Sequence, residues 1–427
     1  MRVRGRASPL RVHLGAICAL AAFVSCGAGA ADWTFGGHAK YRYTRTDYRA
    51  GDLQATLGED PASDHDLDLR LKAEGERGPW EAAVHYEILA LFGDTAAVRA
   101  AAAPLAFVGR AVGLPDDRRR LLDLTDSFSD GARRAAVHRL DRLYVGYRRG
   151  AAALRFGRQA LSWGNGLVFH PLDFINPFSP LAIDKDYKTG DDMLYVQWLR
   201  ADGGDLQAIA VPRRDPATGD LAGSESTYAA KLRVRLGEFD LDLVAAQHVD
   251  DALAGIGLVR SIGGAVWRLD ALHTRPERGD DAWSFVTNLD YSWVWGARNY
   301  YGFVEYFRNG FGAADPAGYA TPDPALAARL ERGELFTLAR DYAAAGVQVE
   351  LHPLFNVYTN LIWNLTDGSR FLQLRGVYDW RQNVQLMAGI NLPAGDRGEE
   401  YGGIPLPGLG VFLAPGRALY LRAAYYF

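Results

Sequence analysis

The sequence predicts an all-β protein, a transmembrane antiparallel β-barrel of about eighteen strands with long outer loops and short periplasmic turns. Two observations support this fold class. Apolar and polar residues alternate over segments of about ten residues or more, which suits strands that cross a bilayer. The polar side of the alternation is also heavily charged, and unpaired charges do not form a dry core, whereas a water-filled lumen accepts them.

The first thirty residues have the pattern of a secretory signal peptide. An Arg-rich start precedes an apolar run, and small residues precede Ala31. Lipoprotein processing at Cys26 is the alternative, although Phe23-Val24-Ser25 is a poor lipobox. Both cysteines, Cys18 and Cys26, fall in this segment, so residues 31–427 are expected to form the barrel without disulfides, thiolate metal sites or a cysteine nucleophile.

The alternation is clear in individual segments. In 64–76 the apolar positions are Leu67, Leu69, Leu71 and Ala73, and the polar positions between them are Asp66, Asp68, Arg70, Lys72 and Glu74. The predicted strands are 33–46, 64–76, 80–92, 138–149, 152–163, 192–202, 204–213, 227–238, 239–251, 253–262, 264–275, 281–295, 298–310, 339–352, 355–367, 370–382, 384–394 and 418–427. Sixteen strands is the alternative count, because alternation is weak in 204–213 and 253–275.

The connections give an independent check on this topology. Those after even-numbered strands are short, and the long ones, 93–137, 164–191, 311–338 and 395–417, all follow odd-numbered strands. Bacterial barrels have short periplasmic turns and longer outer loops, so both chain ends are expected in the periplasm.

The third outer loop, 164–191, is predicted to fold inward as a constriction loop. Its Gly and Pro residues fix turns, and its aromatic residues need a surface to pack on. The candidate residues that would set the charge of the passage are Arg158, Asp173, Asp184, Lys185, Asp186, Lys188, Asp191 and Asp192. The alternatives are a lid over the barrel rim that contacts no solute, and a calcium site formed by Asp184, Asp186, Asp191 and Asp192, which the interleaved lysines argue against.

A second candidate feature is a basic track along the lumen, read from strand parity. Its residues are Lys231, Arg233, Arg235, Arg268 and Arg375. Such a track would attract an anionic solute. The alternative is that these cations form cross-strand ion pairs that brace the wall.

Enzymatic function is not expected. The sequence lacks G-x-S-x-G and H-E-x-x-H motifs, and its histidines share no metal-ligand spacing. No cofactor or metal is therefore predicted. The near-balanced net charge of −4 gives no indication of nucleic-acid binding.

The combination of a signal peptide, about eighteen strands, Gly157-Arg158-Gln159 followed by Trp163-Gly164 and Asn176-Pro177, and a terminal Phe427 resembles alginate-export-type porins and related bacterial porin-like families. The resemblance implies passage of a polysaccharide or another organic solute through the bacterial outer membrane, with lipid and lipopolysaccharide as surroundings. Phe427 resembles the signal that the barrel-assembly machinery reads. The mixed lumen charges depart from the strongly basic lumen of alginate exporters.

We therefore expect an outer-membrane channel for passive passage or export of a hydrophilic organic solute that could be anionic. The alternative is a plugged structural barrel that anchors a surface polymer or an envelope complex.

Overall fold

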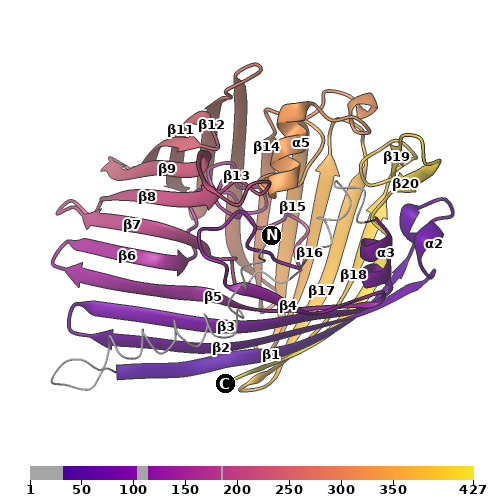
Figure 1. Ribbon diagram of the computed structural model, residues 1–427, viewed down its shortest axis with the longest axis horizontal. Coiled ribbons are helices and arrows are strands. Elements are labelled where there is room, and N and C mark those ends of the chain that lie inside the picture. The colour runs from indigo at the N-terminus through magenta and orange to yellow at the C-terminus, as the bar shows by residue number, and fades with distance from the viewer. Residues whose placement is uncertain (1–31, 103–113, 184–185) are drawn as a thin grey trace, which may run out of the picture.

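The computed structural model describes residues 32–102, 114–183 and 186–427, so the predicted signal peptide, 1–30, lies outside the described residues. Within them, eighteen antiparallel strands form a closed wall in which β1 (Asp32–Asp47) pairs with β21 (Arg417–Tyr426) (Figure 1). The predicted eighteen-stranded barrel is confirmed.

The other wall strands follow one another along the chain, each paired with the next. They are β2 (Ala62–Arg77), β3 (Trp80–Gly93), β5 (Arg134–Arg149), β6 (Ala152–Gln159), β7 (Asp191–Leu199), β8 (Asp205–Arg214), β9 (Leu221–Leu236), β10 (Phe239–His248), β11 (Asp251–Ile262), β12 (Ala265–Arg275), β13 (Ala282–Trp295), β14 (Arg298–Arg308), β15 (Asp341–His352), β16 (Phe355–Asn364), β17 (Arg370–Arg381) and β18 (Val384–Ala394). The segments with weak alternation thus form strands as well.

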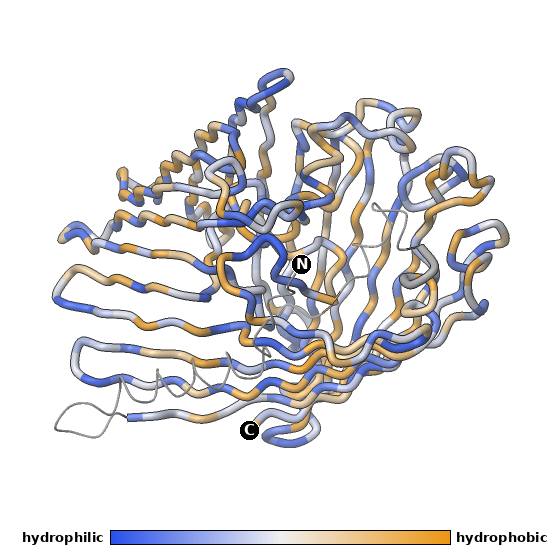
Figure 2. Tube along the Cα trace, viewed as in Figure 1, coloured by the Kyte–Doolittle hydropathy of each residue, from blue (hydrophilic) through white to orange (hydrophobic). Residues whose placement is uncertain are grey.

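Alternate residues of each strand face opposite sides of the wall, and Figure 2 shows the resulting alternation of apolar and hydrophilic positions. On β2, Leu67 and Leu71 are 44% and 46% exposed, whereas Arg70 is 2% exposed. Other exposed apolar side chains on the wall include Phe156, Trp198, Leu289, Val304 and Leu421. A continuous outer surface of this kind is suited to the hydrocarbon of a bilayer, while the charged side chains face the lumen.

Tight turns connect adjacent strands at one end of the barrel. Leu236 pairs directly with Phe239, so Gly237 and Glu238 alone make the turn, and Gly237 adopts a φ of 62° that glycine accepts without strain. We call it the periplasmic end, after the usual position of short turns in bacterial barrels.

The opposite, outer end carries the long connections and the small elements within them. These are α2 (Leu53–Leu57), α3 (Asp94–Ala102), β4 (Thr125–Gly131), the 3-10 helix η1 (Pro316–Gly318), α5 (Pro324–Arg332), β19 (Ile404–Leu406) and β20 (Val411–Leu413). Asp52, next to α2, forms a bridge with Phe412 of β20, and these elements lie side by side in Figure 1. None of the helices among the described residues is long and apolar enough to cross a membrane.

The strands β6 and β7 are only 8 and 9 residues long, so they leave a gap in the outer part of the wall. A segment that was not predicted as part of the wall fills this gap. β4 pairs with the outer half of β5. Residues 114–124 then connect β5 to β8, because the Leu140 N–H donates to the Leu124 carbonyl (3.0 Å) and the Arg214 N–H donates to the Arg119 carbonyl (2.9 Å). The segment 114–124 therefore bridges the gap that the two short strands leave.

Candidate functional site

The connection 160–190, between β6 and β7, crosses the interior of the barrel. Its first part is held by carboxylates on the inner faces of distant strands. The backbone N–H and the amide of Asn165 donate to Asp270 on β12 (2.6 and 2.7 Å). The N–H groups of residues 167, 168 and 169 donate to Glu305 on β14 at 2.6, 3.0 and 2.9 Å. These two carboxylates serve as anchors for the loop backbone.

Apolar side chains of the same connection pack against the inner wall. Leu172, Phe174 and Ile175 are buried against inward residues of β7 to β12. Phe169 stacks on Phe307 of β14, with ring centroids 4.6 Å apart. This packing explains the aromatic residues of the loop, since burying apolar area is the main favourable term in ordering it.

The far part of the loop reaches the opposite wall. Gln373 and Arg375 on β17 donate to the carbonyls of residues 181 and 183 at 3.2 and 3.1 Å. Asp186 then accepts bonds from Lys40 on β1 (2.7 Å) and from the hydroxyl of Tyr426 on β21 (2.9 Å). The loop thus spans the lumen from β6 to β1.

The return of the loop to β7 is fixed by a buried ion pair. Lys188 Nζ lies 2.5 Å from Asp173 Oδ1, and it also donates to the Leu161 carbonyl. Burial raises the pKa of Asp173 to about 6 against the opposing attraction of Lys188, and burial also lowers the pKa of Lys188. The N–H of Gly190 donates to the Asp141 side chain on β5 (3.1 Å). A Cβ at position 190 would lie 2.3 Å from the Asp141 carbonyl oxygen, so this close approach requires glycine.

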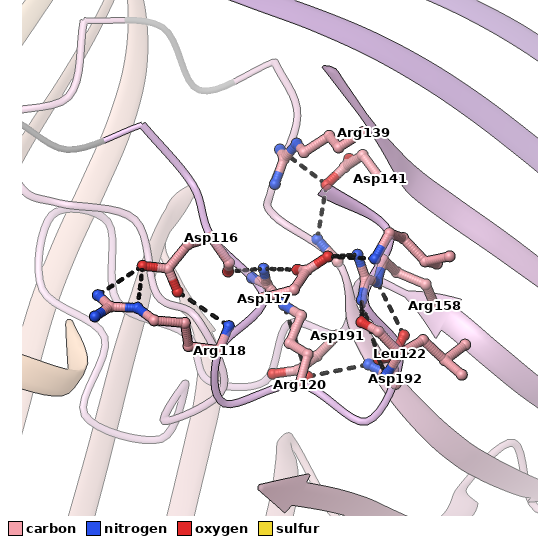
Figure 3. A network of polar contacts seen from close by, with 12 residues as sticks. Asp116, Asp117, Arg118, Arg120, Leu122, Arg139, Asp141, Arg158, Asp191 and Asp192 are labelled. Atoms are coloured by element: carbon pink, nitrogen blue, oxygen red, sulfur yellow. Dashed lines mark hydrogen bonds and ion pairs between the residues drawn. The ribbon is translucent and has the colours of Figure 1, made fainter. Parts of the chain in front are cut away.

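A dense ion network joins the short strands to the segment 114–124 (Figure 3). Arg158 donates to Asp192 and to Asp117 at 2.9 Å each, and all three side chains are 1% exposed. Although burial alone would raise it, the guanidinium groups of Arg158 and Arg120 lower the pKa of Asp117 to about 2. Asp191 pairs with Arg213 and accepts from Asn176 (3.1 Å).

Two large polar cavities lie beside the loop. The outer one, of about 540 Å³, extends from Thr46 and Asp64 near the outer ends of β1 and β2 down to Lys40 and Arg70. Its other charged residues are Arg42, Asp66, Asp68, Glu87, Arg139 and Arg422. The Tyr187 ring also lines it, 4.4 Å from the Arg70 guanidinium.

The inner cavity, of about 480 Å³, lies between the loop residues Pro180, Ala182, Ile183 and Asp186 and the strands β14 to β18. It extends to Tyr358 and Gln385, which lie close to the periplasmic turns. Arg422 lines both cavities, and the contact between Lys40 of the outer cavity and Asp186 of the inner one lies between them. A solute that moved between the cavities would therefore pass these three side chains.

The predicted loop residues thus separate into distinct groups. Asp186 lines the inner cavity, whereas Arg158, Asp191 and Asp192 are buried in ion pairs at the wall, and Asp173 and Lys188 pair with each other. Asp184 and Lys185 lie outside the described residues. No group of three or more His, Cys, Asp or Glu side chains in the described part of the chain is arranged to hold a metal ion.

The five residues of the predicted basic track also differ in their surroundings. Arg375 lines the inner cavity, with its guanidinium 4.5 Å from the Tyr358 ring. The others have acidic partners on neighbouring strands: Lys231 and Arg233 with Asp242, Arg235 with Asp240, and Arg268 with Asp290. Strand parity found the inward side of the wall but could not identify which cations have partners.

Three contributors were not predicted as site residues. The strand parity around Glu305 is ambiguous in the sequence, and Asp117 belongs to a connection without periodicity. Arg422 lies on the last strand, β21. The alternation along β21 could have placed it inward, but its position between two cavities depends on the loop.

At the end of the chain, the Phe427 N–H donates to the Gly37 carbonyl of β1 (3.2 Å), and the Gly37 N–H donates to the Phe427 carbonyl (2.8 Å). The Phe427 side chain is 49% exposed. Its role as an assembly signal stays a prediction.

No protein-family model matches the chain, and no curated protein sequence matches it. Solved structures match over 93% of its length. They include OccAB1 of Acinetobacter baumannii (9% identity, 96% of that chain, TM-score 0.54). OpdK of Pseudomonas aeruginosa, solved with vanillate, matches with 13% identity, over 98% of that chain and with a TM-score of 0.50. A BenF-like porin of Pseudomonas fluorescens Pf-5 matches with 10% identity, over 98% of that chain and with a TM-score of 0.50.

At identities this low, the similarity shows the fold alone, a β-barrel like that of these three structures. None of these three structures is named as an alginate exporter, so the resemblance to that type extends only to the barrel architecture.

Proposed function

We propose that the protein is a passive channel of the bacterial outer membrane for small hydrophilic organic solutes, with anions favoured. The observation that supports this proposal most directly is that a polar cavity lies on each side of the loop and that Arg422 lines both cavities. Outer-membrane location follows from the apolar outer surface and from the barrel that it shares with a structure named as a porin.

The preference for anions rests on the charges of the inner cavity. Among the described residues, Arg375 and Arg422 are its cations, and Asp186 is its acidic side chain, already bonded to Lys40 and Tyr426. This excess of positive charge lowers the energy of an anion in a narrow polar passage. The structure of OpdK with vanillate, a carboxylate, is consistent with the same class of solute.

A small solute is favoured over a polysaccharide. The connection 160–190 crosses the lumen and is fixed to β1, β12, β14 and β17, which divides the interior into cavities of about 540 and 480 Å³. Cavities of this size are comparable to ligand sites for small molecules. The proposal includes lipid and lipopolysaccharide as the surroundings, and the barrel-assembly machinery as a partner that reads Phe427.

The second candidate, a plugged barrel that anchors a polymer or an envelope complex, is favoured by the many fixed contacts of the loop. Reconstitution into planar bilayers separates the two. The channel proposal expects discrete conductance steps with selectivity for anions in a salt gradient. Purified protein that inserts but conducts no current at any voltage would contradict it and support the plugged barrel.

A further inference from the structure

Amide and phenol side chains line the inner cavity, whereas mainly charged side chains make up the polar lining of the outer cavity. Besides its two arginines and Asp186, the inner cavity is lined by four amide side chains, one on each strand from β15 to β18. They are Gln348, Asn360, Gln373 and Gln385. In the part of the chain that the structure describes, two tyrosines, Tyr301 and Tyr358, complete the polar lining. The outer cavity has charged side chains of both signs in their place.

Each of these amides keeps hydrogen-bonding groups that a ligand can use. Gln373 donates to the Leu181 carbonyl, and Gln348 donates to Asn356 (3.1 Å). Gln385 donates to Asp379 (3.0 Å) and accepts from Arg422 (2.6 Å). A primary amide has two N–H donors and a carbonyl with two lone pairs, so each keeps at least one donor. Among the described residues, the Asn360 side chain has no hydrogen-bond partner.

This combination matches a ligand that carries both a carboxylate and hydroxyl groups. Arg375 and Arg422 supply the cations for the carboxylate, and the stacking of Arg375 on Tyr358 holds its guanidinium in position. A hydroxyl donates one bond and accepts others, which suits free amide donors and acceptors. An alkyl chain in the same place would displace water from the amides without replacing its bonds, and sites built for hydroxyls reject such analogues strongly.

We propose that the inner cavity selects polyhydroxylated carboxylates, the sugar acids, over carboxylates of the same length that lack hydroxyl groups. This inference rests on the proposed channel function and names its substrate class. In the outer cavity, by contrast, the acids are matched by cations, as in the contacts of Arg42 with Asp66 and of Arg70 with Glu87. Hydroxyl recognition therefore belongs to the inner cavity.

The test compares gluconate with hexanoate, two six-carbon monocarboxylates that differ in their hydroxyl groups. Reversal potentials in planar bilayers with one anion on each side give their permeability ratio. The wild-type protein is expected to favour gluconate. Asn360→Leu and Gln373→Met, which keep side-chain size, should each reduce the ratio about fivefold, the factor that corresponds to one net hydrogen bond.

Gln197→Met is the matched control, because Gln197 on β7 bonds to Asp205 and lines neither cavity. It should leave the ratio at the wild-type value. Heat-modifiable electrophoretic mobility checks that each variant is folded, and Gln348→Met replaces any variant that is not.

Currents that favour hexanoate, or an unchanged ratio in folded Asn360→Leu and Gln373→Met proteins, would overturn the inference and leave the channel function intact. The absence of current with either anion would instead contradict the proposed channel function itself.

Discussion

Arg158 on β6 and Asp192 on β7 are direct partners in the register of the wall and join through two hydrogen bonds of 2.9 and 3.0 Å. The same guanidinium binds Asp117 and the Leu122 carbonyl of the segment 114–124. Removing one member of a buried ion pair is costly because the charge that stays buried loses a counter-charge and gains no water in its place. The pair therefore fastens the two short strands to the segment that completes the wall.

Asp192→Asn should destabilise the barrel by roughly 3 kcal/mol, the usual cost of breaking a buried ion pair. Urea unfolding in detergent, followed by electrophoretic mobility without heating, measures the change. Asp202→Asn is the control, because Asp202 pairs with Arg200 at an exposed turn and should have no measurable effect. Equal unfolding curves for Asp192→Asn and wild type would contradict a bracing role.

Glu305→Ala should loosen the constriction loop. Three backbone N–H groups lose their acceptor, at about 1 kcal/mol for each net hydrogen bond. Single-channel recordings are expected to show a larger mean conductance and more current noise. Glu350→Ala is the control, since Glu350 lies on the neighbouring strand near the periplasmic end and accepts from Asn299. Unaltered conductance in Glu305→Ala would mean that the loop does not limit the passage.

Asp186→Asn should increase selectivity for anions, because it removes the acidic side chain that lines the inner cavity beside Arg375 and Arg422. The reversal potential in a salt gradient should move toward the value for a purely anion-selective pore. The neutral asparagine can still accept from Lys40 and Tyr426, so the loop should stay in place. A reversal potential identical to that of wild type would place Asp186 outside the ion path.

Glu400, in the outer connection 395–403, gives a pH-dependent prediction. Burial raises its pKa from 4.5 to about 7, despite bonds from the Leu338 N–H and the Tyr342 hydroxyl. A raised carboxyl pKa contributes stability that is complete below pH 4.5 and is lost as pH rises through 7. Hydrogen exchange of this connection, corrected for intrinsic rates, should show less protection at pH 8 than at pH 5.

Glu400→Gln should remove most of this pH dependence, because glutamine does not titrate. Glu399→Gln is the control for charge, since Glu399 is partly exposed and accepts from the backbone N–H of Asp396. A Glu400→Gln protein that kept the wild-type slope would assign the pH dependence to another group.

The sequence predicted the wall well because a barrel strand depends on local alternation. Leu67, Arg70 and their neighbours on β2 face the predicted sides. The strand predicted at 152–163 ends at Gln159 instead, because Trp163 leaves the wall and its ring N–H donates to Gln207 on β8, two strands away. Strand ends depend on contacts far along the chain, which periodicity does not encode.

The site was less predictable for the same reason. The inward direction of Lys231 and Arg233 could be read from parity, but their shared partner Asp242 depends on the register between β9 and β10. The hydrogen bonds between the loop backbone and Glu305 join residues more than a hundred positions apart. Only the folded loop determines which charges line a cavity and which are buried in ion pairs.

The most direct test of a passage through both cavities uses single cysteines, because the sequence has cysteines only at positions 18 and 26, within the predicted signal peptide. Thr44→Cys and Asn360→Cys introduce thiols into the outer and inner cavities, and Val304→Cys introduces one on the lipid-facing surface. A charged thiol reagent should reduce the single-channel conductance of the first two variants and leave the third unchanged. Conductance that persists unaltered after complete modification of both cavity cysteines would contradict the account.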